Sequence, residues 1–120
     1  MSDFLPAPVK AAISHTAFEA IDIRLGTIKA VEDVPTSRKL VKLTVSFGDH
    51  TRKILAGVKQ ERPDPGTLLG QQALFVVNLE PRVMAGETSE GMLFDIGYSD
   101  GLVPALAIAE RPLPDGARAG

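Results

Sequence analysis

Strict alternation between apolar and polar residues over residues 41–47 is the feature that most constrains the fold of this chain. The segment reads Val-Lys-Leu-Thr-Val-Ser-Phe, so four apolar side chains share one face and Lys42, Thr44 and Ser46 share the other. Successive side chains of a β-strand point to opposite sides, and the pattern therefore predicts a half-buried strand. One face of this strand packs on a core, and the other meets solvent or a ligand.

Four further segments have strand patterns, and Gly or Pro residues separate them: residues 21–31, 52–56, 74–78 and 91–96. Gly26 interrupts the first of these segments and predicts a bulge or a sharp bend in a long first strand. Five short strands, a bent first strand and no long helix favour an all-β architecture, a five-stranded Greek-key barrel of the OB-fold type.

The rest of the chain flanks this barrel. Residues 1–17 form a peripheral extension, in which the capping-box spacing of Thr16–Glu19 predicts one helical turn. Residues 95–120 contain an apolar run at 102–109 and a tail that its prolines keep extended. We expect residues 1–120 to form one domain, in which the apolar run either caps the core or lies in a subunit interface.

The composition argues against a catalytic, cofactor or metal site. The chain has no cysteine, which excludes disulfides, thiolate metal ligands and cysteine nucleophiles. His15 and His50 lie outside any H-E-x-x-H motif, and no glycine-rich loop precedes a Lys-Ser/Thr pair. The first residues lack the basic start and the apolar core that a signal peptide has, and no apolar run approaches the roughly 18 residues of a membrane span. We therefore expect a cytoplasmic protein that is not an enzyme, needs no cofactor and does not enter a membrane.

Charge is distributed unevenly along the chain, although the net charge is only −2. Between residues 24 and 62 there are nine Lys and Arg against four Asp and Glu, whereas residues 80–115 contain seven acidic residues and two arginines. Such an asymmetry indicates nucleic-acid binding, although a solvated face produces the same pattern.

An OB barrel binds oligonucleotides across its second and third strands. Here that face carries Lys42 on one strand and Lys53 on the other. Arg38 and Lys39 stand just before the second strand. We expect these four side chains to contact phosphates.

The connection over residues 78–94 has an unusual set of polar side chains. Asn78 and Arg82 lie at its start, and Ser89 and Glu90 lie just before the next apolar strand. Loops that a rigid sheet holds often carry binding residues. We expect Arg82 to contact phosphate as well, and Asn78, Ser89 and Glu90 to shape the site.

Several segments together resemble the tRNA-binding domain family, which includes the C-terminal module of bacterial methionyl-tRNA synthetases, free-standing tRNA-binding proteins and the export-related chaperone CsaA. The resemblance runs from about residue 18 to residue 116 and rests on Asp22–Ile28, Arg38–Leu40, Ala56–Val58, Leu69–Gly70, Val76–Arg82 and Ser89–Leu93. It implies an OB-fold, tRNA as the ligand and a homodimer formed by segments that flank the barrel. It thereby favours a dimer role for residues 95–120.

The resemblance combines features of two branches. Ala56–Val58 and Ser89–Met92 are similar to the tRNA-binding branch, whereas Ser37–Lys39 and the tail at 111–116 are similar to the CsaA branch. The first hypothesis is therefore a free-standing homodimer that binds tRNA. The alternative is a CsaA-like chaperone that binds unfolded preproteins for export.

Two methionines matter for this alternative, since flexible thioether side chains suit promiscuous surfaces. Met84 lies in the polar connection and is expected to be exposed there, unless it caps the barrel mouth. Met92 begins an apolar strand, where a core position is the more common outcome. Val34-Pro35 replaces the His-Pro pair of many tRNA-binding relatives, which removes an imidazole from this corner.

Overall fold

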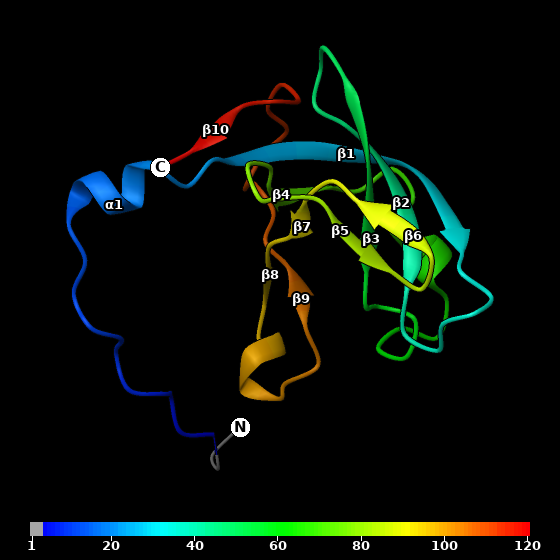
Figure 1. Cartoon of the computed structure of the whole chain (residues 1–120), viewed down its shortest axis with the longest axis horizontal. Coiled ribbons are helices and arrows are strands. Elements are labelled where there is room, and N and C mark those ends of the chain that lie inside the picture. The colour runs from blue at the N-terminus through cyan, green and yellow to red at the C-terminus, as the bar shows by residue number, and fades with distance from the viewer. Residues whose placement is uncertain (1–3) are drawn as a thin grey trace.

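The longest strand, β1 (Ile23–Asp33), organises the fold of the computed structural model, which describes residues 4–120 (Figure 1). β1 pairs antiparallel with two neighbours, β2 (Val41–Ser46) and β4 (Gln72–Val76). β3 (Thr51–Ala56) extends the sheet beyond β2, and β7 (Met92–Leu93) extends it beyond β4. These five antiparallel strands form a nearly closed barrel, which confirms the predicted OB-fold.

The remaining elements are short. The described residues contain one α-helix, two 3₁₀ helices and five strands outside the barrel: α1 (His15–Glu19), η1 (Pro65–Leu68), η2 (Tyr98–Asp100), β5 (Arg82–Met84), β6 (Glu87–Ser89), β8 (Asp95–Ile96), β9 (Ala105–Leu106) and β10 (Arg118–Ala119). β5 pairs with β6, and β8 pairs with β9, in separate two-stranded sheets. β10 pairs with the start of β1. The predicted polar connection at 78–94 thus contains a β-hairpin, and the predicted strand at 91–96 is divided between two sheets.

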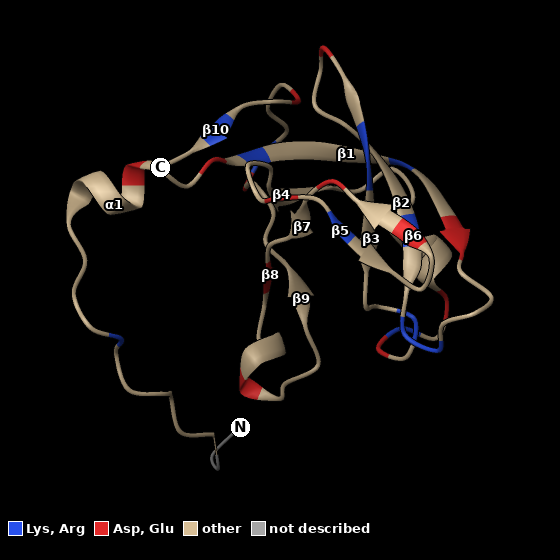
Figure 2. Ribbon diagram, viewed as in Figure 1, with Lys and Arg blue, Asp and Glu red and all other residues tan. Residues whose placement is uncertain are grey.

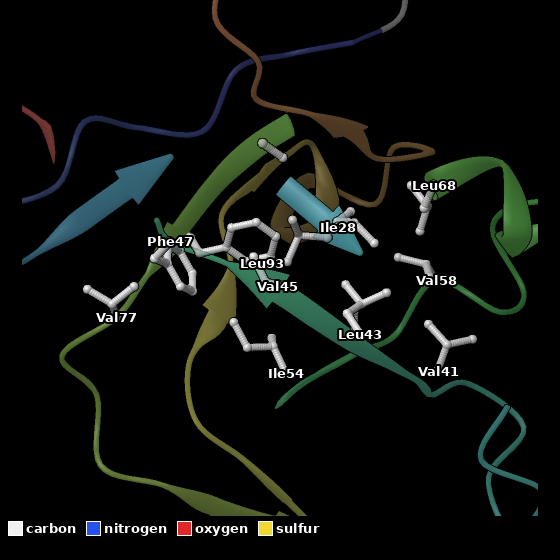
Figure 3. Close-up of a cluster of buried hydrophobic side chains, with 13 residues drawn as sticks. Ile28, Val41, Leu43, Val45, Phe47, Ile54, Val58, Leu68, Val77 and Leu93 are labelled. Atoms are coloured by element: carbon white, nitrogen blue, oxygen red, sulfur yellow. The ribbon is translucent and has the colours of Figure 1, made fainter. Parts of the chain in front are cut away.

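The core confirms the alternation seen in the sequence. Val41, Leu43, Val45 and Phe47 are all buried, whereas the residues between them are partly exposed. Figure 3 shows these side chains gathered inside the barrel. Phe47 meets Phe75 edge to face, with 5.7 Å between the ring centroids, an arrangement that aromatic pairs favour.

Gly26 has a different role from the predicted bulge. The register of β1 against β2 shifts between Ile28 and Ala30, so the irregularity lies at Lys29. A Cβ on Gly26 would lie 2.6 Å from Cγ1 of Val45 and 2.7 Å from Cε1 of Phe47. Gly26 is therefore required because β2 side chains pack directly against its backbone.

The helix in the N-terminal extension begins earlier than the capping pattern indicates. The hydroxyl of Ser14 caps α1 by accepting the N–H of Ala17 over 3.0 Å, and Thr16 lies inside the helix. Residues 4–14 have no regular secondary structure, and every one of them is exposed. In Figure 1 they run outside the barrel. Residues 1–3 of the predicted extension lie outside the described residues.

The C-terminal region leaves the barrel and then returns to it. β8, η2 and β9 form an arm beside the barrel (Figure 1), and the apolar side chain of Val103 on this arm is 81% exposed. The tail then runs along β1, where Thr27 donates its hydroxyl hydrogen to Asp115 over 2.6 Å. None of the helices within residues 4–120 is long and apolar enough to cross a membrane.

Candidate nucleic-acid interface

The exposed face of β2 and β3 brings two predicted cationic residues together. Thr44 on β2 pairs with Lys53 on β3, and Lys42 lies two residues before Thr44 on the same side. The Lys53 ammonium donates to Thr44 Oγ1 over 2.7 Å and lies 3.8 Å from a carboxylate oxygen of Glu32. The alternation of β2 thus places both lysines on the side away from the core.

A pocket of about 530 Å³ opens on this face. It is here called the basic pocket, and it is lined by Lys42, Lys53, Pro81, Gly86, Glu87, Thr88 and Glu90. Lys42 forms an ion pair with Glu87 over 3.3 Å. Figure 2 shows the acidic start of β6 close to a basic segment of β2. The two lysines therefore share the pocket with two carboxylates, and a bound anion must compete with these carboxylates for them.

A larger hollow of about 800 Å³, here called the apolar groove, lies beside β3, β5 and β7. It is lined by Ser37, Lys39, Leu40, residues 55–58, Arg82, Met84 and residues 92–100. Four predicted site residues therefore share one groove: Lys39, Arg82, Met84 and Met92.

Aromatic and charged residues complete the lining of the groove. Met92 is 46% exposed, and the expectation that it is more often a core residue is wrong here. Phe94 and Tyr98 add exposed aromatic surface. Burial raises the pKa of the Asp95 carboxyl in this lining. Glu61 is not part of the lining, and burial together with the nearby Asp95 charge raises its pKa. The lining of the groove thus combines cationic, acidic and apolar side chains.

Ser89 and Glu90 close the barrel. Ser89 is 2% exposed, and its hydroxyl accepts the Leu55 N–H over 3.0 Å and donates to the Gly91 carbonyl over 2.9 Å. The Glu90 N–H donates to the Lys53 carbonyl over 2.8 Å, and the Glu90 carboxylate accepts the Lys53 N–H over 2.9 Å. These bonds replace the strand ladder that β3 and the very short β7 do not form. Ser89 therefore supports the site from inside, whereas Glu90 also lines the basic pocket.

The amide of Asn78 is engaged within the protein. Its nitrogen donates to the Ala20 carbonyl over 2.6 Å, and its oxygen accepts the Asp22 N–H over 2.8 Å. These bonds tie the entry of β1 to the end of β4. Arg38 is exposed on the β1–β2 connection and lines neither of the two hollows.

Two basic residues have structural roles that their sequence positions do not indicate. The Arg52 guanidinium donates to the carbonyls of Val77 and Glu90, across the line where the barrel closes. The Lys59 ammonium donates to the Val34 carbonyl over 3.0 Å and to the Ser37 carbonyl over 2.7 Å. Lys59 thereby fixes the loop that carries Arg38 and Lys39. Its partners are 22 and 25 positions away, so only the folded chain shows them.

Comparison with known proteins agrees with this geometry. The tRNA binding domain family matches residues 23–118. A methionine–tRNA ligase from Chlorobium chlorochromatii is 42% identical over 92 residues, which is 77% of this chain but only 13% of that protein. The chain therefore corresponds to the binding domain and spans a small part of the ligase.

Two solved structures share the fold along almost the whole chain. The MetRS-related protein from Pyrococcus horikoshii has a TM-score of 0.84 and 32% identity, and the match covers 92% of this chain and all of that one. The chaperone CsaA from Bacillus anthracis has a TM-score of 0.79 and 28% identity, with the same coverage. The chain belongs to the tRNA binding domain family.

Proposed function

We propose that the protein binds tRNA across the β2–β3 face and the adjoining cationic side of the apolar groove, without catalysing a reaction. The grouping of four cationic side chains around the β5–β6 hairpin carries this proposal. Lys42 and Lys53 line the basic pocket, Lys39 and Arg82 line the groove, and the hairpin contributes residues to both. Membership of the tRNA binding domain family supports the choice of ligand.

The available side chains favour recognition of folded RNA by its shape. Lys and Arg contacts to phosphates supply affinity and fix the register, while shape is read at backbone and 2′-hydroxyl groups. Binding of generic single strands depends on aromatic platforms that stack bases. The chain has five Phe and one Tyr, and Phe47 and Phe75 are buried in the core. Within residues 4–120, no aromatic side chain lines the basic pocket, and Phe94 and Tyr98 are the two that line the apolar groove.

The proposed assembly is a free-standing homodimer in the cytoplasm, the compartment that a tRNA ligand favours. Exposed apolar side chains concentrate in the two flanking segments, and they include Leu5, Val9, Val103 and Ile108, all more than 60% exposed. Contiguous exposed apolar surface marks interaction sites, and a small domain gains stability by burying it. A second copy is the partner we propose for residues 95–120.

An electrophoretic shift assay with total tRNA at rising salt tests the proposed ligand. We expect binding at low salt that weakens as salt increases, because phosphate contacts release counterions. The double variant R38A/K39A is expected to bind more weakly and to have a flatter salt dependence. K10A/K29A removes the same charge from exposed positions that line neither hollow, and it serves as the control. The absence of any shift at low salt would contradict tRNA binding.

A second candidate function is peptide binding by a CsaA-like chaperone, and the apolar groove is the observation that favours it. Met84 and Met92 line the groove together with Lys39 and Phe94, so an apolar segment with acidic residues would meet matching surfaces. The solved CsaA structure shares this fold. Titration of a denatured preprotein into the protein tests this function. Binding that M84S/M92S abolishes, in the absence of a tRNA shift, would make the chaperone the preferred function.

A further inference from the structure

We propose that Glu87 holds Lys42 in the place that an RNA phosphate takes, so that Glu87 sets the affinity of the basic pocket for polyanions. The inference rests on the proposed tRNA-binding function and adds a built-in competitor to it. Glu87 is not among the residues expected from the sequence to form the site. Glu87 lines the basic pocket because the β5–β6 hairpin brings its carboxylate onto the β2–β3 face.

The contact between the two side chains spans 45 positions of sequence. A carboxylate oxygen of Glu87 lies 3.3 Å from the Lys42 ammonium, and within residues 4–120 it is the side-chain partner of that ammonium. The Lys42 side chain is 24% exposed and that of Glu87 is 42% exposed. A phosphate can therefore approach this lysine from solvent, and the Glu87 carboxylate occupies part of the available space.

The local backbone explains why Glu87 is held there. β5 and β6 are joined by a tight turn in which Ala85 and Gly86 have φ values of 50° and 78°, as a two-residue hairpin requires. At the other end of β6, the buried Ser89 is bonded to β3. The hairpin is thus anchored at its base, and Glu87 lies next to its turn. Rotation of the partly exposed Glu87 side chain is enough to release Lys42, without movement of the barrel.

Energetics favour exchange of this carboxylate for a phosphate of a long polyanion. A partly exposed ion pair of this kind contributes little stability, so its loss is easily offset. A single carboxylate on a free ligand competes poorly with Glu87, which is tethered and has a high effective concentration. RNA presents several phosphates that engage Lys42, Lys53 and their neighbours together and release counterions. Glu87 therefore makes the pocket selective for dense phosphate chains.

The test is a double-mutant cycle on tRNA affinity at low salt, with wild type, E87Q, K42A and K42A/E87Q. We expect E87Q to lower the dissociation constant about two- to fivefold, the range that corresponds to the free energy of an ion pair near the protein surface. In the K42A background the gain from E87Q is expected to disappear. E80Q provides the matched control, because it removes one negative charge from the same connection, and Glu80 has no ion pair within residues 4–120.

The outcomes distinguish the role of Glu87 from the proposed tRNA binding itself. A gain in tRNA affinity in E87Q that exceeds the gain in E80Q and depends on Lys42 supports the competitor role of Glu87. An equal gain in E87Q and E80Q, or a gain that persists in full in K42A/E87Q, shows general repulsion and overturns the inference while tRNA binding stands. If wild type and E87Q both fail to bind tRNA, the proposed function is overturned and the inference with it. Equal melting temperatures of E87Q and wild type show that the variant is folded.

Discussion

The hydroxyl of Ser89 accepts the backbone N–H of Leu55 over 3.0 Å, in the interior of the barrel. This bond joins β3 to the chain just before β7, where the two strands form no regular ladder. The Ser89 side chain thus helps to close the barrel at a place where β3 and β7 do not pair as strands. The same hydroxyl donates to the Gly91 carbonyl, so both of its hydrogen-bonding roles are used.

Replacement of Ser89 by Ala is expected to destabilise the protein by about 1–3 kcal/mol, because the buried Leu55 N–H loses its partner. Chemical denaturation gives the change in the free energy of unfolding. T88A, at the exposed neighbouring position, is the control and is expected to differ from wild type by less than about 0.5 kcal/mol. Equal midpoints for S89A and wild type would remove Ser89 from the closure of the barrel.

Gly26→Ala is expected to destabilise the fold by about 1–3 kcal/mol, since the added methyl overlaps the side chains of Val45 and Phe47. Gly57→Ala is the matched substitution, because a Cβ at Gly57 meets no atom within 4 Å. Thermal unfolding of both variants measures the difference. Equal melting temperatures of G26A and G57A would contradict the close packing of Val45 and Phe47 against Gly26.

Asp95→Asn is expected to stabilise the protein at neutral pH. Burial raises the pKa of Asp95 in the folded state, so folding favours its protonated form. Between the unfolded pKa of about 3.9 and the higher folded pKa, the folded state binds more protons, and stability falls as pH rises. An asparagine at position 95 does not ionise, so D95N lacks this loss of stability at higher pH.

Denaturation of wild type and D95N at several pH values checks the sign of this effect. The two proteins are expected to be closest in stability below the unfolded pKa and to diverge as pH rises. D100N changes an exposed neighbour in the same groove and controls for net charge. A constant difference between D95N and wild type over the whole pH range would contradict the effect of burial.

Val103→Lys tests the proposed dimer. Val103 lies on the arm beside the barrel and is 81% exposed, so a charge at this position opposes burial in an interface. Light scattering is expected to give a dimeric mass for wild type and a monomeric mass for V103K. Leu69→Lys alters an apolar residue that is 58% exposed after η1, and it is expected to leave the mass unchanged. A monomeric wild type would exclude the dimer.

Periodicity predicted the barrel because several of its strands are long enough to show alternation. β2 has six residues, and each inward position is apolar. β7 and β8 have two residues each, too few to define a period, so the division of residues 91–96 between two sheets was not predictable. The role of Gly26 depends on Val45 and Phe47 opposite it, and these contacts exist only after β1 and β2 pair.

The sequence predicts which residue types form the site. How these side chains contact one another depends on residues far apart in the chain, and only the structure shows it. Lys42 and Lys53 were placed on one face by strand alternation, and the structure keeps them there. Ser89 is a residue type that often contacts ligands. Its hydroxyl instead accepts the N–H of Leu55, 34 positions away, and this bond gives Ser89 a structural role. Glu87 belongs to no sequence motif. Its contact with Lys42 depends on the β5–β6 hairpin, whose strands have three residues each, too few to show a periodic pattern in the sequence.

The salt dependence of tRNA binding by K42A/K53A tests the central claim most directly. If both lysines contact phosphates, the slope of log affinity against log salt is expected to fall by about 0.7–0.9 for each phosphate that the variant no longer neutralises. K10A/K29A, with equal charge loss at exposed positions that line neither hollow, is expected to keep the wild-type slope. An unchanged slope and affinity in K42A/K53A would show that tRNA does not bind across β2 and β3.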